Sequence, residues 1–183
     1  IYGPLDAEAH EQYRMFKKLG VFGVDRTAAG ARAFLRTGGA ILAEPRASLW
    51  ITAEGAFTDP RARPVSIMPG VAHLAKRMTH GRIVPLAIEY PFWNERSPLA
   101  LSRFGAPIEV GASEVDDWQA LLEARLTETM EALAADARSR EATRFRPVLT
   151  GARSVGLVYD SWRRLRAAVT GRSYRPGHEE RPT

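Results

Sequence analysis

The sequence predicts an α/β fold in which a mixed, partly parallel sheet is flanked by helices. Short β-prone segments alternate with segments whose apolar residues recur at helical spacing, in the order helix, strand, helix, strand, helix, strand, strand. Such alternation is typical of strands that are joined through helices and run parallel. The chain has 183 residues and is 45% hydrophobic, which suffices for one core. We find no internal repeat in it.

The first forty residues predict a helix, a strand and a second helix. Asp6 has the side chain of an N-cap, and the first helix should run to Gly20, with apolar residues Leu5, Ala9, Tyr13, Phe16 and Leu19 on one face. Residues 21–24 form a short buried strand. Thr27 can cap the second helix, which we expect Gly38 and Gly39 to end.

The next segment predicts a strand over residues 49–53, which ends in a polar turn containing Glu54 and Gly55. A helix should follow from Pro69, with Val71, Leu74, Ala75 and Met78 on its apolar face. Residues 82–90 are strongly β-prone. Pro85 cannot donate to a strand ladder, so it should lie at a strand start or at a sheet edge.

Two further strands are expected at residues 100–104 and 107–110, before the longest helix. We expect Ser113 to cap this helix. Its apolar positions are spaced three or four residues apart, which predicts core packing and not a cofactor site; they are Val115, Trp118, Leu122, Leu126, Thr129, Leu133 and Ala137.

Composition excludes several classes of protein. There is no uninterrupted apolar run of the roughly 18 residues that a transmembrane helix needs. The chain has no Cys, and its four His show no zinc-ligand spacing, so we expect neither a disulfide nor a metal or other cofactor. Basic and aromatic residues are not interleaved on strands and no recognition helix is evident, so we expect no nucleic-acid partner.

The net charge of +5 is concentrated at the C-terminal end. Residues 144–183 contain nine Arg and three acidic residues, a net charge of +6, so the first 143 residues carry −1. Residues 159–169 predict a short basic amphipathic helix, and the last dozen residues should be disordered. Such a helix suits an anionic membrane surface, or it packs on the domain as a closing helix.

Several segments occur in an order that points to a family. They are residues 21–26 (VFGVDR), 52–58 (TAEGAFT), 70–75 (GVAHLA), 84–86 (VPL) and 103–108 (RFGAPI). In this order they resemble the glycerolipid acyltransferases, which include the 1-acylglycerol-3-phosphate acyltransferases. The blocks of that family read roughly G-x-F-x-x-R, F-P-E-G-T-R-S, a glycine-led helix, V-P followed by an apolar residue, and F-G-x-P-I. The resemblance covers about residues 16–110.

The resemblance implies an enzyme that moves a fatty acyl group from acyl-CoA or acyl-carrier protein to a hydroxyl of a lysophospholipid or related glycerolipid. Arg26 would clamp a phosphate or other anion. Glu54 would accept hydrogen bonds from acceptor hydroxyls or hold Arg26 in place, and Gly55 would let the backbone approach the ligand. Taken singly, Arg26 and Glu54 also fit an ordinary surface turn and an ordinary strand end.

The chain departs from the family in two ways. The H-x-x-x-x-D block, which supplies the general base and its orienting carboxylate, is absent from these residues. We expect it upstream of Ile1, so this chain alone should be incomplete for catalysis. Phe57 replaces the arginine that follows the family's E-G, which favours a less anionic or bulkier acceptor; Arg61 or Arg63 could supply the missing charge.

We therefore expect residues 1–143 to form an acyltransferase domain and residues 144–183 a basic extension. The protein should act as a peripheral protein at the cytoplasmic face of a membrane. Two alternatives stay open: a catalytically silent relative that binds a lipid or a protein partner, and an α/β module that binds anions or nucleic acid.

Overall fold

The structure, a computed structural model, describes residues 1–12, 18–56, 58–94, 97–111 and 115–149. The chain divides into two units, Ile1–Arg144 and Phe145–Thr183, and the elements below belong to the first. Helices and small parallel and antiparallel sheets make this unit a mixed α/β structure. The partly parallel character of the sheet was therefore predicted correctly, but the described strands form three two-stranded sheets and not one.

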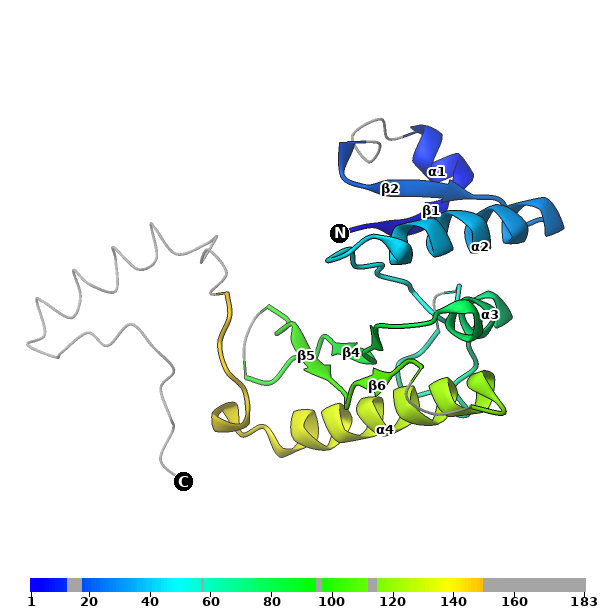
Figure 1. The fold of residues 1–183 in the computed structure, drawn as a ribbon. Helices are drawn as coiled ribbons and strands as arrows, with labels where there is room; N and C mark the ends of the chain where they lie inside the picture. The colour runs from blue at the N-terminus through cyan, green and yellow to red at the C-terminus, as the bar shows by residue number, and fades with distance from the viewer. Residues whose placement is uncertain (13–17, 57, 95–96, 112–114, 150–183) are drawn as a thin grey trace, which may run out of the picture. The chain divides into compact units, whose positions relative to one another are not determined.

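The N-terminal sheet pairs β1 (Gly3–Asp6) with β2 (Val21–Val24) in parallel, as Figure 1 shows. Helix α1 (Ala7–Gln12) follows β1 directly and contacts β2. The prediction of one helix up to Gly20 is wrong at both ends that the structure describes: Leu5 lies in β1, and Leu19 is exposed outside any helix. No local pattern indicated β1, because three of its four residues are Gly, Pro and Asp, which are depleted in strands. Tyr13 and Phe16 lie outside the described residues.

Helix α2 (Ala28–Ala43) begins as predicted, because the Thr27 hydroxyl accepts a hydrogen bond of 3.0 Å from Gly30 N. It does not end at Gly38 and Gly39. Gly38 lies against helix α3 (Pro69–Arg77), where a Cβ would come within 3.1 Å of Leu74 Cδ2. This glycine therefore provides room for helix–helix packing and does not end the helix.

The predicted strand at residues 49–53 is reduced to one parallel bridge between Leu49 and Tyr2. Trp50 N donates to Tyr2 O at 2.8 Å, so the segment does start along the free edge of β1. The backbone then turns, and Gly55 N donates to Thr52 O at 3.2 Å. The turn takes residues 51–53 away from the ladder, which explains why the strand stops.

Pro85 divides the predicted strand 82–90 into two. β3 (Arg82–Ile83) pairs antiparallel with β6 (Ile108–Glu109), and β4 (Leu86–Glu89) pairs antiparallel with β5 (Leu101–Phe104). Pro85 has no N–H to donate, so a ladder cannot continue through it. It precedes β4 directly, which agrees with the predicted position at a strand start.

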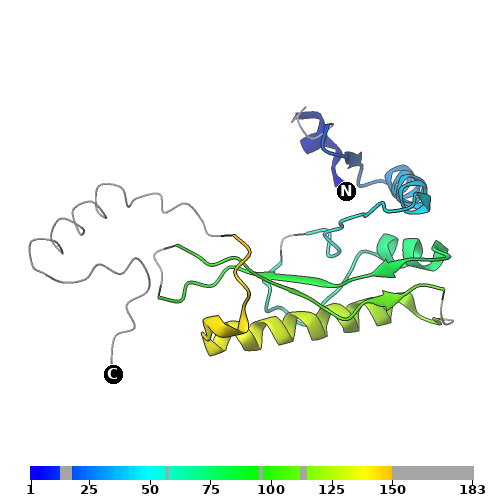
Figure 2. The same cartoon turned by 60° about the vertical axis from the view of Figure 1, so that its left-hand side comes forward.

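The longest helix is α4 (Trp118–Ser139), which lies along β4 and β5 (Figure 2). Its N-cap is Asp117, whose Oδ1 accepts from Ala120 N at 3.0 Å; the predicted cap, Ser113, lies outside the described residues and four positions before that cap. The predicted core stripe is confirmed at Leu122, Thr129, Leu133 and Ala137, which are buried, while Trp118 and Leu126 are partly buried. Val115 lies before the helix, and the buried Ala134 was not predicted.

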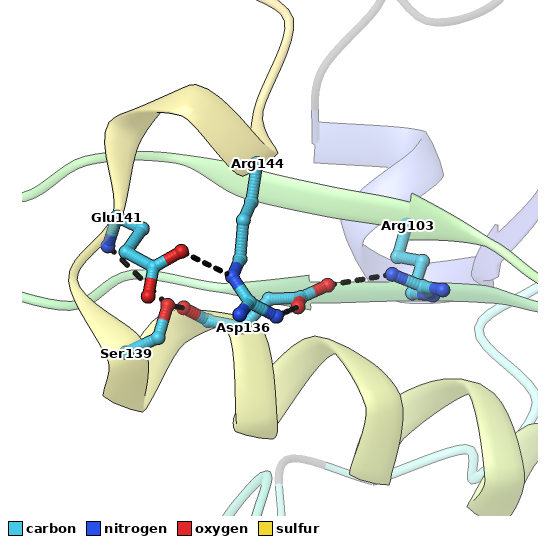
Figure 3. A network of polar contacts seen from close by, with 5 residues as sticks. All are labelled: Arg103, Asp136, Ser139, Glu141 and Arg144. Atoms are coloured by element: carbon cyan, nitrogen blue, oxygen red, sulfur yellow. Dashed lines mark hydrogen bonds and ion pairs between the residues drawn. The ribbon is translucent and has the colours of Figure 1, made fainter.

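A network of ion pairs holds the C-terminal end of α4 (Figure 3). Asp136 lies 2.6 Å from Arg103 of β5 through Oδ2, and 3.1 Å from Arg144 through Oδ1. Arg144 belongs to the 3-10 helix η2 (Ala142–Arg144) and also binds Glu141 at 2.8 Å. Hydrogen bonds from its guanidinium to Glu141 and then to Asp136 raise the pKa of Arg144 above its ordinary value. The network joins β5, α4 and η2.

Candidate functional site

Glu54 lies at the turn that ends the 49–53 segment, on the wall of a pocket of about 400 Å³. The pocket volume is within the range of small-molecule sites. Its described lining comes from the turn, from the loop that follows, from the start of α3 and from the first turn of α4; the residues are Glu54, Thr58, Ala62, Pro64, Ser66, Ile67, Met68, Pro69 and Gln119. The pocket therefore joins segments that lie more than sixty residues apart.

One hydrogen bond closes the loop over residues 54–67. Met68 N donates to Ala53 O at 2.8 Å, which brings the start of α3 beside the Glu54 turn. Inside the loop, Val65 and Ile67 are buried in a core cluster with Ala75 and Leu122. The loop is consequently anchored at its base by apolar packing as well as by the backbone bond.

Two side chains of α4 fix the backbone of Ile67. Glu123 Oε1 accepts from Ile67 N at 3.0 Å, and Gln119 Nε2 donates to Ile67 O at 2.8 Å. The same Gln119 nitrogen lies 2.6 Å from Glu123 Oε1, so the two side chains support each other. Both polar groups of one buried residue are satisfied by a rigid helix, and this positions one wall of the pocket.

Glu54 is half-buried, and its Oε1 accepts a hydrogen bond of 2.8 Å from the hydroxyl of Thr58. Within the described part of the chain, no cation pairs with this carboxylate. Its second oxygen is left to accept a hydrogen bond from a molecule in the pocket.

Gly55 adopts a left-handed backbone with φ of 65°. A Cβ there would meet Met68 Cγ at 2.7 Å, so the space above Gly55 is filled by a side chain of the protein. The glycine is required for the turn and for the approach of Met68. From the sequence we expected Gly55 to let the backbone approach a ligand. In the structure, the side chain of Met68 occupies the space where a Cβ of residue 55 would lie.

Arg26 is separate from this pocket. Its Nε lies 3.4 Å from Oδ2 of Asp6, the last residue of β1, and its side chain is 81% exposed. The structure records no ion pair between Arg26 and Glu54 among the residues it describes. The strand end of β2 thus presents Arg26 beside Asp6, and the two predicted binding residues are not joined.

The two other arginines considered from the sequence lie in the loop itself. Arg63 donates through Nη1 to Pro60 O at 3.1 Å and to Ala62 O at 2.7 Å, and its Nε is 3.8 Å from Glu131. The backbone N of Arg61 donates to Asp59 at 2.8 Å. Neither arginine lines the pocket.

Five residues of the pocket and its support were not predicted from the sequence: Thr58, Ser66, Met68, Gln119 and Glu123. Gln119 and Glu123 lie four residues apart in a predicted helix, and this spacing is the one sequence feature that indicates contact between their side chains. No local feature of the sequence links either residue to Ile67. None of the three described histidines lines the pocket: His10, for example, contacts Val21 O at 3.1 Å. A second, smaller pocket of about 110 Å³ lies between the ends of α2 and α3 and includes His80.

The described residues contain no cluster of three or more potential metal ligands. Among the same residues, no helix has both the length and the hydropathy to cross a bilayer. Comparisons of the chain with protein-family models, with curated proteins and with solved structures found no match.

Proposed function

We propose that this chain is the acceptor-binding part of an O-acyltransferase. The reaction moves a fatty acyl group from acyl-CoA or acyl-carrier protein to a hydroxyl of a lysophospholipid or related glycerolipid. The observation that carries the proposal is the position of Glu54, a half-buried carboxylate on the wall of a pocket of about 400 Å³, with one oxygen that no described residue occupies. The order of the segments that resemble the glycerolipid acyltransferases supports it.

Glu54 has the chemistry that an acceptor site requires. A carboxylate oxygen that no described residue occupies accepts a hydrogen bond from a hydroxyl and orients it for attack on a thioester. Thr58 holds the other oxygen, so the carboxylate does not rotate freely. We assign the general base to the histidine of an H-x-x-x-x-D block, a motif that these 183 residues do not contain. Because the acceptor is a lipid, we place the reaction at the cytoplasmic face of a membrane, with the protein bound peripherally.

The test compares Glu54→Ala with the unchanged protein, both expressed from the complete gene. With labelled acyl-CoA and a lysophospholipid or monoacylglycerol, kcat/KM should fall by about 100-fold or more, the usual cost of removing a hydrogen-bond partner of the reacting group. Glu128→Ala is the matched control, because Glu128 is an exposed carboxylate of α4 that binds Arg125 and does not line the pocket.

Circular dichroism and thermal melting of Glu54→Ala should match those of the unchanged protein. Full activity of Glu54→Ala would exclude the site. If the unchanged protein binds glycerolipid but transfers no acyl group, the chain is instead a catalytically silent lipid-binding relative.

A further inference from the structure

The described wall of the pocket carries a single ionised side chain, Glu54. The other polar residues are Thr58, Ser66 and Gln119, which are neutral, and the rest of the lining is apolar. The pocket wall is therefore negative as far as the structure describes it.

The arginines considered from the sequence, Arg26, Arg61 and Arg63, are not part of the described wall of the pocket. Arg63 binds two carbonyl oxygens of its own loop and approaches Glu131. Arg26 approaches Asp6 at the end of β1. At the start of α3, Pro69 has no N–H, and Val71 N donates to Met68 O at 2.9 Å. No described side chain of the wall carries a positive charge that could pair with a phosphate.

A phosphate ester in this pocket would lie beside a carboxylate, and like charges repel. A neutral group with several hydroxyls is not repelled by the carboxylate and can form hydrogen bonds with the wall of the pocket. Its hydroxyls would donate to Glu54 and accept from Ser66, and its carbon atoms would contact Ile67 and Met68; all four residues line the pocket.

Resting on the proposed acyltransferase function, we propose that the acceptor group bound beside Glu54 is an uncharged polyol, as in a monoacylglycerol, and not a phosphate. Glu54 is then a specificity-determining residue, because its charge excludes anionic acceptors. From the sequence, Phe57 favoured a less anionic or bulkier acceptor. The proposal is more specific, since it names an uncharged polyol, and it depends on Glu54 and the other residues that line the pocket.

A binding experiment tests the proposal without any catalysis. The probes are soluble short-chain compounds that differ only in the phosphate: 1-butyrylglycerol and 1-butyrylglycerol 3-phosphate. Each is titrated into ¹⁵N-labelled protein, and the shifts of the Gln119 side-chain amide and of the Thr58 and Ser66 backbone amides are followed. The neutral compound should bind at least tenfold more tightly. In Glu54→Gln this ratio should shrink severalfold, whereas Glu128→Gln, which removes the same charge outside the pocket, should leave it unchanged.

Tighter binding of the phosphate compound, or no shift of these amides with either compound, would overturn the proposal. The same pair of acceptors, with long acyl chains, is then compared in the acyl-transfer assay with protein from the complete gene. Preferred acylation of the phosphate compound contradicts the neutral acceptor but leaves the acyltransferase function standing. Binding of the neutral compound without transfer to either acceptor contradicts the acyltransferase function alone.

Discussion

Arg103 Nη1 of β5 lies 2.6 Å from Oδ2 of Asp136 near the end of α4, and this pair joins a strand to the helix that covers it (Figure 3). The side chain of Asp136 is only 16% exposed, whereas that of Arg103 is 46% exposed. The acid is thus the more shielded partner, and its removal leaves Arg103 without its ion pair in the described structure.

Asp136→Ala should lower the free energy of unfolding by about 1–2 kcal/mol, a value reduced from that of a buried pair because both arginines reach solvent. Urea titration followed by circular dichroism measures this change. Glu128→Ala, which removes an exposed pair on the same helix, should cost less than about 0.5 kcal/mol. Equal losses of unfolding free energy in the two variants would show that the shielded position of Asp136 does not strengthen its ion pairs.

Glu123→Ala should destabilise the loop that forms the pocket. The variant leaves the partly buried Ile67 N–H without its acceptor, which costs about 1–3 kcal/mol. Glu123→Gln keeps a carbonyl oxygen at this position and should restore much of the stability. Amide hydrogen exchange at Ile67 gives the local measurement, and it should accelerate in Glu123→Ala more than in Glu123→Gln. Unchanged exchange in both variants would mean that Glu123 does not hold the loop.

Gly38→Ala should stabilise the protein less than Gly39→Ala or destabilise it, although the two residues are neighbours in α2. A Cβ at Gly39 meets nothing within 4 Å, so alanine should stabilise the helix by about 1 kcal/mol. A Cβ at Gly38 would lie 3.1 Å from Leu74 Cδ2, and the resulting overpacking offsets or exceeds the same gain. Thermal melting of the two variants decides this. A gain of equal size at both positions would contradict the close packing of α2 on α3.

Gly55→Ala should cost about 1–3 kcal/mol, because alanine is strained at φ of 65° and its Cβ collides with Met68. The double variant Gly55→Ala/Met68→Ala separates the two causes. The cost of Gly55→Ala in the Met68→Ala background measures the backbone strain. The amount by which this cost is smaller than in the unchanged protein measures the collision. Denaturant unfolding of all four proteins provides the values. A neutral Gly55→Ala would contradict the left-handed turn.

The elements that the sequence determined are those encoded by local chemistry. Thr27 caps α2 because its hydroxyl reaches a backbone N–H three residues ahead, and the core stripe of α4 follows from a period that any amphipathic helix obeys. Pro85 marks a strand start because it lacks an N–H. Glu54 was singled out by its place in the segments that resemble the glycerolipid acyltransferases, and in the structure it lines a pocket.

The features that only the tertiary structure decided depend on partners distant in sequence. The sequence predicted Gly38 as a helix end, whereas in the structure Gly38 lies inside α2 and packs against Leu74. No local pattern in the sequence indicated the strand β1. Arg26 lies beside Asp6 and forms no ion pair with Glu54 in the described structure, and the order of the segments does not encode this arrangement. Gln119 reaches Ile67 across 52 residues, so the wall of the pocket exists only once α4 has packed against the loop. A sequence specifies such a contact through the summed packing of the whole core and not through any local pattern.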